Sequence, residues 1–206
     1  MNALNPRATA LLVVHLQPDI VSPGTAFGTI FSAEVQSRGV LAKCESAMRS
    51  VRNAGGLVVL LRIAFAEDYS DLDPSIPLLK MVAEAGCLKD GSPGAAIVPG
   101  VTVLDEDAVV THTRPGPFTG AELNELLSTR EITNVVVCGV ATNASVEGAV
   151  RQAADLGYNT HVLSDAVSAA DKSSHEASLG SMGLFARVLS VADLAAAMVP
   201  VARGAL

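Results

Sequence analysis

The sequence is poor in aromatic residues: 206 residues include five phenylalanines, two tyrosines and no tryptophan. Half of the residues are nevertheless apolar, so the core must be built mainly from Val, Leu and Ala side chains. Such a composition is typical of buried parallel strands flanked by alanine-rich helices. The length suits one domain, and we predict a single domain over residues 1–206.

Basic runs and long apolar runs are missing as well. The net charge is −7, without the basic footprint that binds nucleic acid or an anionic membrane surface. No apolar run approaches the roughly 20 residues that span a bilayer. Residues 1–8 lack the charged-then-apolar layout of a signal peptide. We therefore expect a cytoplasmic protein that binds neither nucleic acid nor membrane.

Cysteines are few, and Cys44, Cys87 and Cys138 show no CxxC spacing. An odd number without that spacing argues against a disulfide framework and against a cysteine-rich zinc site. Cys44 falls on the apolar stripe of a predicted helix, and Cys138 falls inside an apolar run. We interpret both thiols as core groups rather than nucleophiles.

Apolar runs alternate with segments of helical periodicity along the whole chain. Strands are predicted at residues 10–16, 57–63, 108–112, 134–139, 160–163 and 186–190. Helices are predicted at residues 32–53, 75–85, 119–129, 143–156, 172–182 and 191–198, with a loop at residues 17–31. Strand then helix, repeated about six times, predicts a three-layer α/β/α protein with a mainly parallel sheet of about six strands.

Three polar residues stand at or just after the carboxyl ends of predicted strands: His15, His112, and Ser145 in the first turn of the helix that follows the fourth strand. Ligands of open parallel sheets bind outside these ends, at a topological switch point, so we expect the three side chains to open on one crevice. A helix-capping serine and structural histidines remain the alternative interpretation. His161, near the start of its strand, and His175, in a predicted surface helix, are interpreted as structural or solvated.

The turn at residues 139–145 joins a strand to a helix through small residues. Backbone N–H groups at such a helix start are free to point at an oxyanion. A hydroxyl there lies near the positive end of the helix dipole. The turn therefore favours a site for a nucleophile or for a developing negative charge.

Three segments carry a resemblance to a known family. They read ALLVVHLQPD from Ala10, VVTHTRPGPFTG from Val109, and VVCGVATNASVE from Val136. In this order they resemble the isochorismatase-like hydrolase family, also called the cysteine hydrolase family, which includes nicotinamidases and N-carbamoylsarcosine amidohydrolase. The resemblance covers nearly the whole chain and implies the fold of that family.

The resemblance also assigns positions, and the residues there differ from the family's. In the family an aspartate takes the thiol proton of a cysteine, a lysine stabilises charge, and the thiolate attacks a carbonyl. Here the aspartate position holds His15, the lysine position His112, and the cysteine position Ser145. The resemblance further implies a cis peptide at Val140–Ala141 and a substrate-facing aromatic residue at Phe118.

The leading hypothesis is a small-molecule hydrolase acting on an amide or a related C–N or C–O bond. Ser145 is its nucleophile or oxyanion-binding hydroxyl, and His15 and His112 supply acid–base catalysis. The alternatives are a non-hydrolytic descendant (a small-molecule binder, a lyase or isomerase, or a pseudoenzyme) and a structural subunit of an active paralogue. The remaining candidate substrate-binding or oxyanion residues are Ala141, Thr142, Asp19, Gln17, Arg114 and Phe118.

Two of these residues have specific expected roles. Asp19 is a candidate to orient His15, and Arg114 is a candidate to meet a substrate carboxylate, with a solvated loop arginine as the alternative. The family's metal-binding subset uses an Asp-x-His pair that residues 62–68 lack, so we expect no metal and no cofactor. The family commonly forms dimers or tetramers, and we expect a homodimer or homotetramer.

Overall fold

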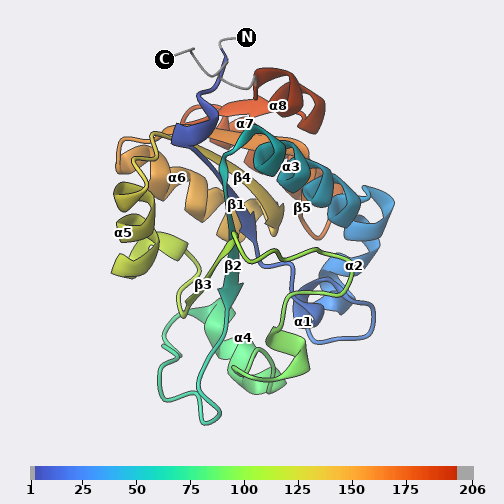
Figure 1. Cartoon of the computed structure of the whole chain (residues 1–206). Helices are drawn as coiled ribbons and strands as arrows, with labels where there is room; N and C mark the ends of the chain where they lie inside the picture. The colour runs from blue at the N-terminus through green and yellow to red at the C-terminus, as the bar shows by residue number, and fades with distance from the viewer. Residues whose placement is uncertain (1–2, 199–206) are drawn as a thin grey trace.

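The computed structural model describes residues 3–198, and its centre is a six-stranded sheet (Figure 1). The strands are β1 (Thr9–Val14), β2 (Leu57–Ile63), β3 (Ala108–His112), β4 (Asn134–Val140), β5 (Asn159–Ser168) and β6 (Arg187–Leu189). They lie in the order β3-β2-β1-β4-β5-β6, and every pair is parallel. The predicted α/β fold class is confirmed. Residues 1–2 and 199–206 of the predicted domain lie outside the described residues.

Helices cover both faces of the sheet. They are α1 (Pro18–Val21), α2 (Gly28–Ser37), α3 (Val40–Ala54), α4 (Pro77–Ala85), α5 (Ala121–Thr129), α6 (Glu147–Asp155), α7 (Lys172–Met182) and α8 (Val191–Ala197). On one face α3 packs against β1 and β5 with α8 beside it, and on the other α6 packs against β4 and β5 with α7 beside it. Within residues 3–198 no helix is long and apolar enough to cross a membrane.

The central strands are buried on both faces, as their continuous apolar sequences require. All six residues of β1 are buried, and so is every residue of β4 except Asn134. Cys44 and Cys138 are fully buried in this core, as predicted. The sheet therefore forms a rigid platform for whatever lies at the strand ends.

Three predicted boundaries are wrong. The helix expected at residues 32–53 is two helices, because Gly39 takes a left-handed conformation (φ 63°) that interrupts the first. The loop expected at residues 17–31 contains α1 and the start of α2. The fifth strand continues to Ser168, because its polar second half pairs with β4 beyond a register shift.

The chain crosses the sheet between β1 and β4: β2 and β3 extend it on one side, and β4 to β6 on the other. This is the topological switch point of an open parallel sheet. Figure 1 shows α1, α2 and α4 gathered below the sheet, at the end toward which the β2 arrow points. These short helices cover the carboxyl ends of the central strands.

Candidate active site

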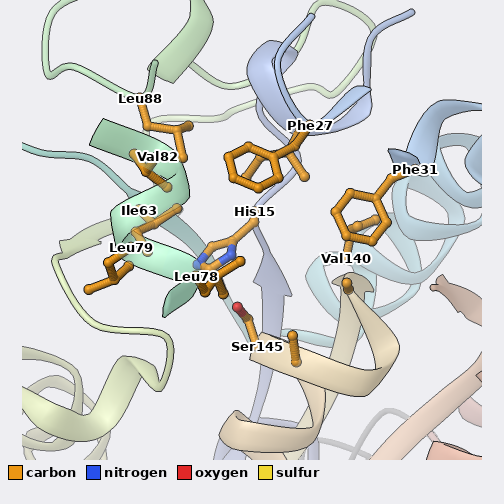
Figure 2. A pocket seen from close by; sticks show the side chains of 13 residues that line it. His15, Phe27, Phe31, Ile63, Leu78, Leu79, Val82, Leu88, Val140 and Ser145 are labelled. Carbon is orange, nitrogen blue, oxygen red and sulfur yellow. The ribbon is translucent and has the colours of Figure 1, made fainter. Parts of the chain in front are cut away.

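A cavity of about 60 Å³ lies at the switch point, under α2 and α4 (Figure 2). Residues at and just after the ends of β1 and β4 line its floor: His15 follows β1, Val140 ends β4, and Ala141 and Ser145 lie in the turn after β4. Its walls are formed by Phe27, which precedes α2, by Phe31 of α2, and by Leu78, Leu79 and Val82 of α4. The cavity therefore lies outside the carboxyl ends of the strands at the switch point, where ligands of open parallel sheets bind.

The backbone at the end of β1 holds His15 in an uncommon conformation. His15 has φ 49°, in the left-handed region that few non-glycine residues adopt. Its N–H donates to the Leu61 carbonyl (3.0 Å). The Gln17 carboxamide accepts from the Ile63 N–H and donates to the Ile63 and Ala95 carbonyls, all at 2.9 Å. Gln17 thus ties the end of β1 to its neighbours and fixes the place of His15.

The two strand-end histidines contact each other directly. Nε2 of His15 lies 3.0 Å from Nε2 of His112, and Nδ1 of His112 lies 2.7 Å from the Arg114 carbonyl oxygen. Since a carbonyl only accepts, His112 carries its proton on Nδ1, and its Nε2 accepts from Nε2–H of His15. The hydrogen-bond network therefore assigns the lone pair of neutral His15 to Nδ1.

Both rings are held in the neutral form. Burial, and secondarily the neighbouring His112, hold the pKa of His15 well below its ordinary value. Burial lowers the pKa of His112 to about 4, although its hydrogen bond to the Arg114 carbonyl acts in the opposite direction. Neutral imidazole is the form that accepts a proton at ordinary pH.

Ser145 sits in a tight turn directly after β4. The Val140–Ala141 peptide is cis, as the resemblance implied, and Thr142–Val146 forms one turn of π-helix before α6 begins. The Ala141 carbonyl accepts from the N–H groups of Ala144 and Val146, both at 3.1 Å. π-Helical turns inside helices occur frequently at functional sites.

The Ser145 hydroxyl and the free nitrogen of His15 are both without partners. Oγ of Ser145 and Nδ1 of His15 hydrogen-bond to no described residue, and neither is among the polar atoms sealed from solvent without a partner. Both residues line the cavity, and Figure 2 shows the hydroxyl oxygen turned toward the side where the His15 ring lies. The cavity thus offers one donor–acceptor hydroxyl and one acceptor nitrogen.

Helix α7 clamps the turn from behind. Nε2 of His175 accepts from Arg38 (2.6 Å), so its Nδ1–H donates to Oγ1 of Thr142 (3.0 Å). Ser178 Oγ lies within hydrogen-bonding distance of the Thr142 carbonyl (3.0 Å) and of Glu147 (2.6 Å). His175 lies in the predicted helix, α7, but its side chain is buried, which excludes the solvated interpretation and fits the structural one.

The other predicted site residues lie around the cavity rather than in it. Asp19 accepts from the Leu88 N–H (2.8 Å) and forms no hydrogen bond with His15 among the described residues. The Arg114 guanidinium lies 3.6 Å from the Asp73 carboxylate and lines a separate depression that also contains His112. Phe118 packs against Tyr158, with ring centres 6.0 Å apart. The side chain of Thr142 faces α7.

No other strong nucleophile or metal-binding group shares the cavity. None of the three cysteines lines it, and burial raises the pKa of Cys87 to about 11. Within residues 3–198 no three His, Cys, Asp or Glu side chains are grouped to hold a metal ion. Ser145 and His15 are therefore the reactive groups that this cavity presents.

Sequence reasoning did not identify the cavity walls. Phe27 and Phe31 fall in a segment that its prolines and glycines marked as a loop, and Leu78 falls on an ordinary amphipathic helix. Apolar residues of this kind are not distinguishable from core residues until the path of the chain over the strand ends is known.

Comparison with known proteins assigns the chain to a family. The family model of the isochorismatase domain matches residues 9–193. The isochorismatase family protein YwoC of Bacillus subtilis (strain 168) is 32% identical over 181 residues, covering 87% of this chain and 88% of YwoC. The chain belongs to the isochorismatase family.

Solved structures share the fold of this isochorismatase-family chain. A cysteine hydrolase from Pseudomonas syringae pv. phaseolicola 1448A has a TM-score of 0.87 and 22% identity, covering 96% of this chain and 95% of its own. N-carbamoylsarcosine amidase from Thermoplasma acidophilum has a TM-score of 0.72 and 20% identity, covering 89% and 96%. At these identities the likeness is one of fold.

Proposed function

We propose that this isochorismatase-family protein is a small-molecule hydrolase that cleaves an amide or a related C–N or C–O bond, with Ser145 as its nucleophile. One observation carries the proposal: His15 and Ser145 line the same cavity at the switch point, and neither Nδ1 of His15 nor Oγ of Ser145 hydrogen-bonds to a described residue. Two points support it: the amidase that shares the fold acts, by its name, on an amide, and in the motif resemblance Ser145 corresponds to the family's cysteine.

The proposed reaction uses His15 as the base. Ser145 Oγ attacks the substrate carbonyl carbon while its proton passes to Nδ1 of His15. Nε2–H of the resulting imidazolium donates to neutral His112, which in turn donates to the Arg114 carbonyl. His112 thus has the orienting role that an acidic residue has in a serine–histidine triad, but without the negative charge.

The remaining steps follow from the turn after β4. The backbone N–H groups near Ala141 and Thr142 stabilise the oxyanion of the tetrahedral intermediate, and α7 keeps the turn in place through Thr142. As the intermediate collapses, the leaving group takes the proton from His15. A water molecule then attacks the carbonyl carbon of the acyl ester and gives a proton to Nδ1 of His15. The ester C–O bond breaks, the acid is released, and Ser145 Oγ takes the proton back from His15.

A second function is favoured by a specific observation. No hydrogen bond joins Ser145 to either histidine in the described structure, and burial makes both rings weak bases. A site of this kind suits a protein that binds a small molecule without cleaving it. The two functions differ in one outcome, which is whether product forms from a bound ligand.

The test is turnover of a panel of small amides and vinyl ethers by the wild-type protein and by Ser145→Ala. We expect the substitution to lower kcat/KM by at least about 100-fold, because it removes the nucleophile. Ser128→Ala, at an exposed position on α5, makes the same chemical change away from the cavity and should leave kcat/KM unchanged. Undiminished turnover in Ser145→Ala, or a ligand-induced rise in Tm without any product, would contradict the proposal.

A further inference from the structure

The cavity differs from a typical site for a polar metabolite in the chemistry of its walls. Among the described residues that line it, every side chain apart from His15 and Ser145 is apolar, and none is Lys, Arg, Asp or Glu. Arg114, the one cation within the second family motif, lies in the separate depression with its guanidinium near Asp73. A charged ligand group entering the cavity would therefore lose its hydration without gaining an opposite charge.

The two polar groups do not change this conclusion. His15 is neutral, since its Nε2–H is taken by His112 and its buried ring resists protonation. Ser145 contributes a neutral hydroxyl. The pair can satisfy the carbonyl and N–H of one amide group, and nothing else among the lining residues can donate or accept through a side chain.

The volume of the cavity limits the size of the ligand. The cavity volume is about 60 Å³. An apolar cavity of about 150 Å³ accommodates a benzene ring, so a ring does not fit here without movement of the walls, and even a smaller branched chain must extend partly into the opening beside Phe31 and Leu78. Phe27 and Phe31 close one side and Leu78 and Leu79 another (Figure 2), leaving room for a compact aliphatic group.

We propose that the site takes the neutral amide of a short branched aliphatic acid, roughly three to five carbons long. Its carboxamide faces His15 and Ser145, and its alkyl chain lies among Phe27, Phe31 and Leu78. The chemical step rests on the proposed hydrolase function, but the choice of ligand rests on the cavity walls alone. Phe31 and Leu78 are the specificity-determining residues, because both are partly exposed at the opening.

The experiment compares three ligands in NMR chemical-shift titrations of Ser145→Ala, which lacks the proposed nucleophile, so that no acyl ester is expected to form. Isovaleramide and malonamate have the same shape, but a carboxylate in malonamate replaces the isopropyl group. Benzamide carries a phenyl ring directly on the carboxamide, in place of the whole isobutyl group. We expect isovaleramide to bind at least about 30-fold more tightly than malonamate, whose carboxylate is left unpaired, and more tightly than benzamide.

A variant at the opening tests the cause of this preference. Leu78→Lys places an ammonium group beside the cavity and should improve malonamate binding about tenfold, while Leu78→Met keeps the wall apolar and should leave the preference unchanged. Both variants change a partly exposed helix position, and circular dichroism checks that they fold.

The outcomes separate this inference from the proposed function. Malonamate or benzamide binding as tightly as isovaleramide, or no binding of isovaleramide at all, overturns the inference. Isovaleramide that binds with the expected preference but is never hydrolysed by the wild-type protein refutes the hydrolase and leaves the ligand class standing. If the wild-type protein hydrolyses malonamate and isovaleramide does not bind, the hydrolase function is supported and the proposed ligand class is overturned.

Discussion

At the scale of single residues, the proposed chemistry depends on a pair of neutral imidazoles. The His112 ring is oriented by the Arg114 carbonyl and in turn directs the lone pair of His15 to Nδ1. A chain of neutral groups avoids burying a charge, but it also makes His15 a weak base, because nothing nearby stabilises the imidazolium by charge. The pH dependence of catalysis should report this directly.

We predict that kcat/KM stays level as the pH falls from 8 to below 6. The base must be neutral to act, and burial holds the pKa of His15 well below 6.5, so protonation removes activity only at a pH well under that value. The measurement is a pH profile of kcat/KM at low substrate. A half-loss of activity near pH 6.5 would show an ordinary, solvated histidine and contradict the assignment.

A carboxylate at position 112 provides the matched comparison. In His112→Glu an anion would accept from Nε2–H of His15, and an opposite charge nearby raises the pKa of the imidazole. The acid limb of the profile should therefore move to higher pH than in the wild-type protein. An unmoved limb would mean that the titrating group is not His15.

The sequence allowed site residues to be predicted mainly from their position at or just after the end of a predicted strand. His15 and His112 were predicted at carboxyl ends of strands because each interrupts or ends a continuous apolar run. The direction in which a side chain points cannot be predicted from such a pattern. Asp19 was expected to orient His15 but turns to the Leu88 N–H, because α1 begins at Pro18 and directs the carboxylate toward the segment after α4.

At the scale of elements, the seam between β1 and β4 places the two halves of the site together. Val14 and Gly139 are partners across this seam, one residue before His15 and shortly before the cis peptide. Gly139 has φ 113°, and a Cβ built there would clash with the backbone carbonyl of Val14. Only glycine lets the two strands approach this closely at Val14 and Gly139, immediately before the residues that line the cavity.

We predict that Gly139→Ala lowers the free energy of unfolding by about 3 kcal/mol or more, because strain at this φ adds to a clash with backbone that cannot rotate away. Gly157→Ala is the control: Gly157 also has positive φ (88°), but a Cβ there meets nothing within 4 Å. It should cost about 1–2 kcal/mol from backbone strain alone. Urea unfolding of both variants checks the difference, and equal losses would show that the close approach to Val14 is unimportant.

At the scale of the whole molecule, the alternation of apolar runs and helical periods sufficed to predict a parallel α/β sheet. The continuous burial of β1 and β4 is the reason, since strands covered on both faces carry apolar residues at every position. The helices that close the cavity could not be assigned to it. Whether α2 and α4 cover the strand ends depends on loop paths, which a hydrophobic pattern does not encode.

The hydrophobic pattern also does not show which of the three predicted residues share one cavity. His15 and Ser145 share the cavity, whereas His112 reaches His15 from the end of β3 and lines a different depression. Strand order decides this arrangement: β1 and β4 are neighbours, and β2 separates β1 from β3. The order is set by long-range pairing, so strand-end position alone could not separate a cavity-lining histidine from one that supports it.

The most direct test of the account is a crystal structure of Ser145→Ala with isovaleramide. The account predicts the amide group between His15 and residue 145, with the alkyl chain among Phe27, Phe31 and Leu78. A ligand found instead in the depression beside Arg114, or a cavity filled by its own side chains while isovaleramide still binds elsewhere, would contradict it.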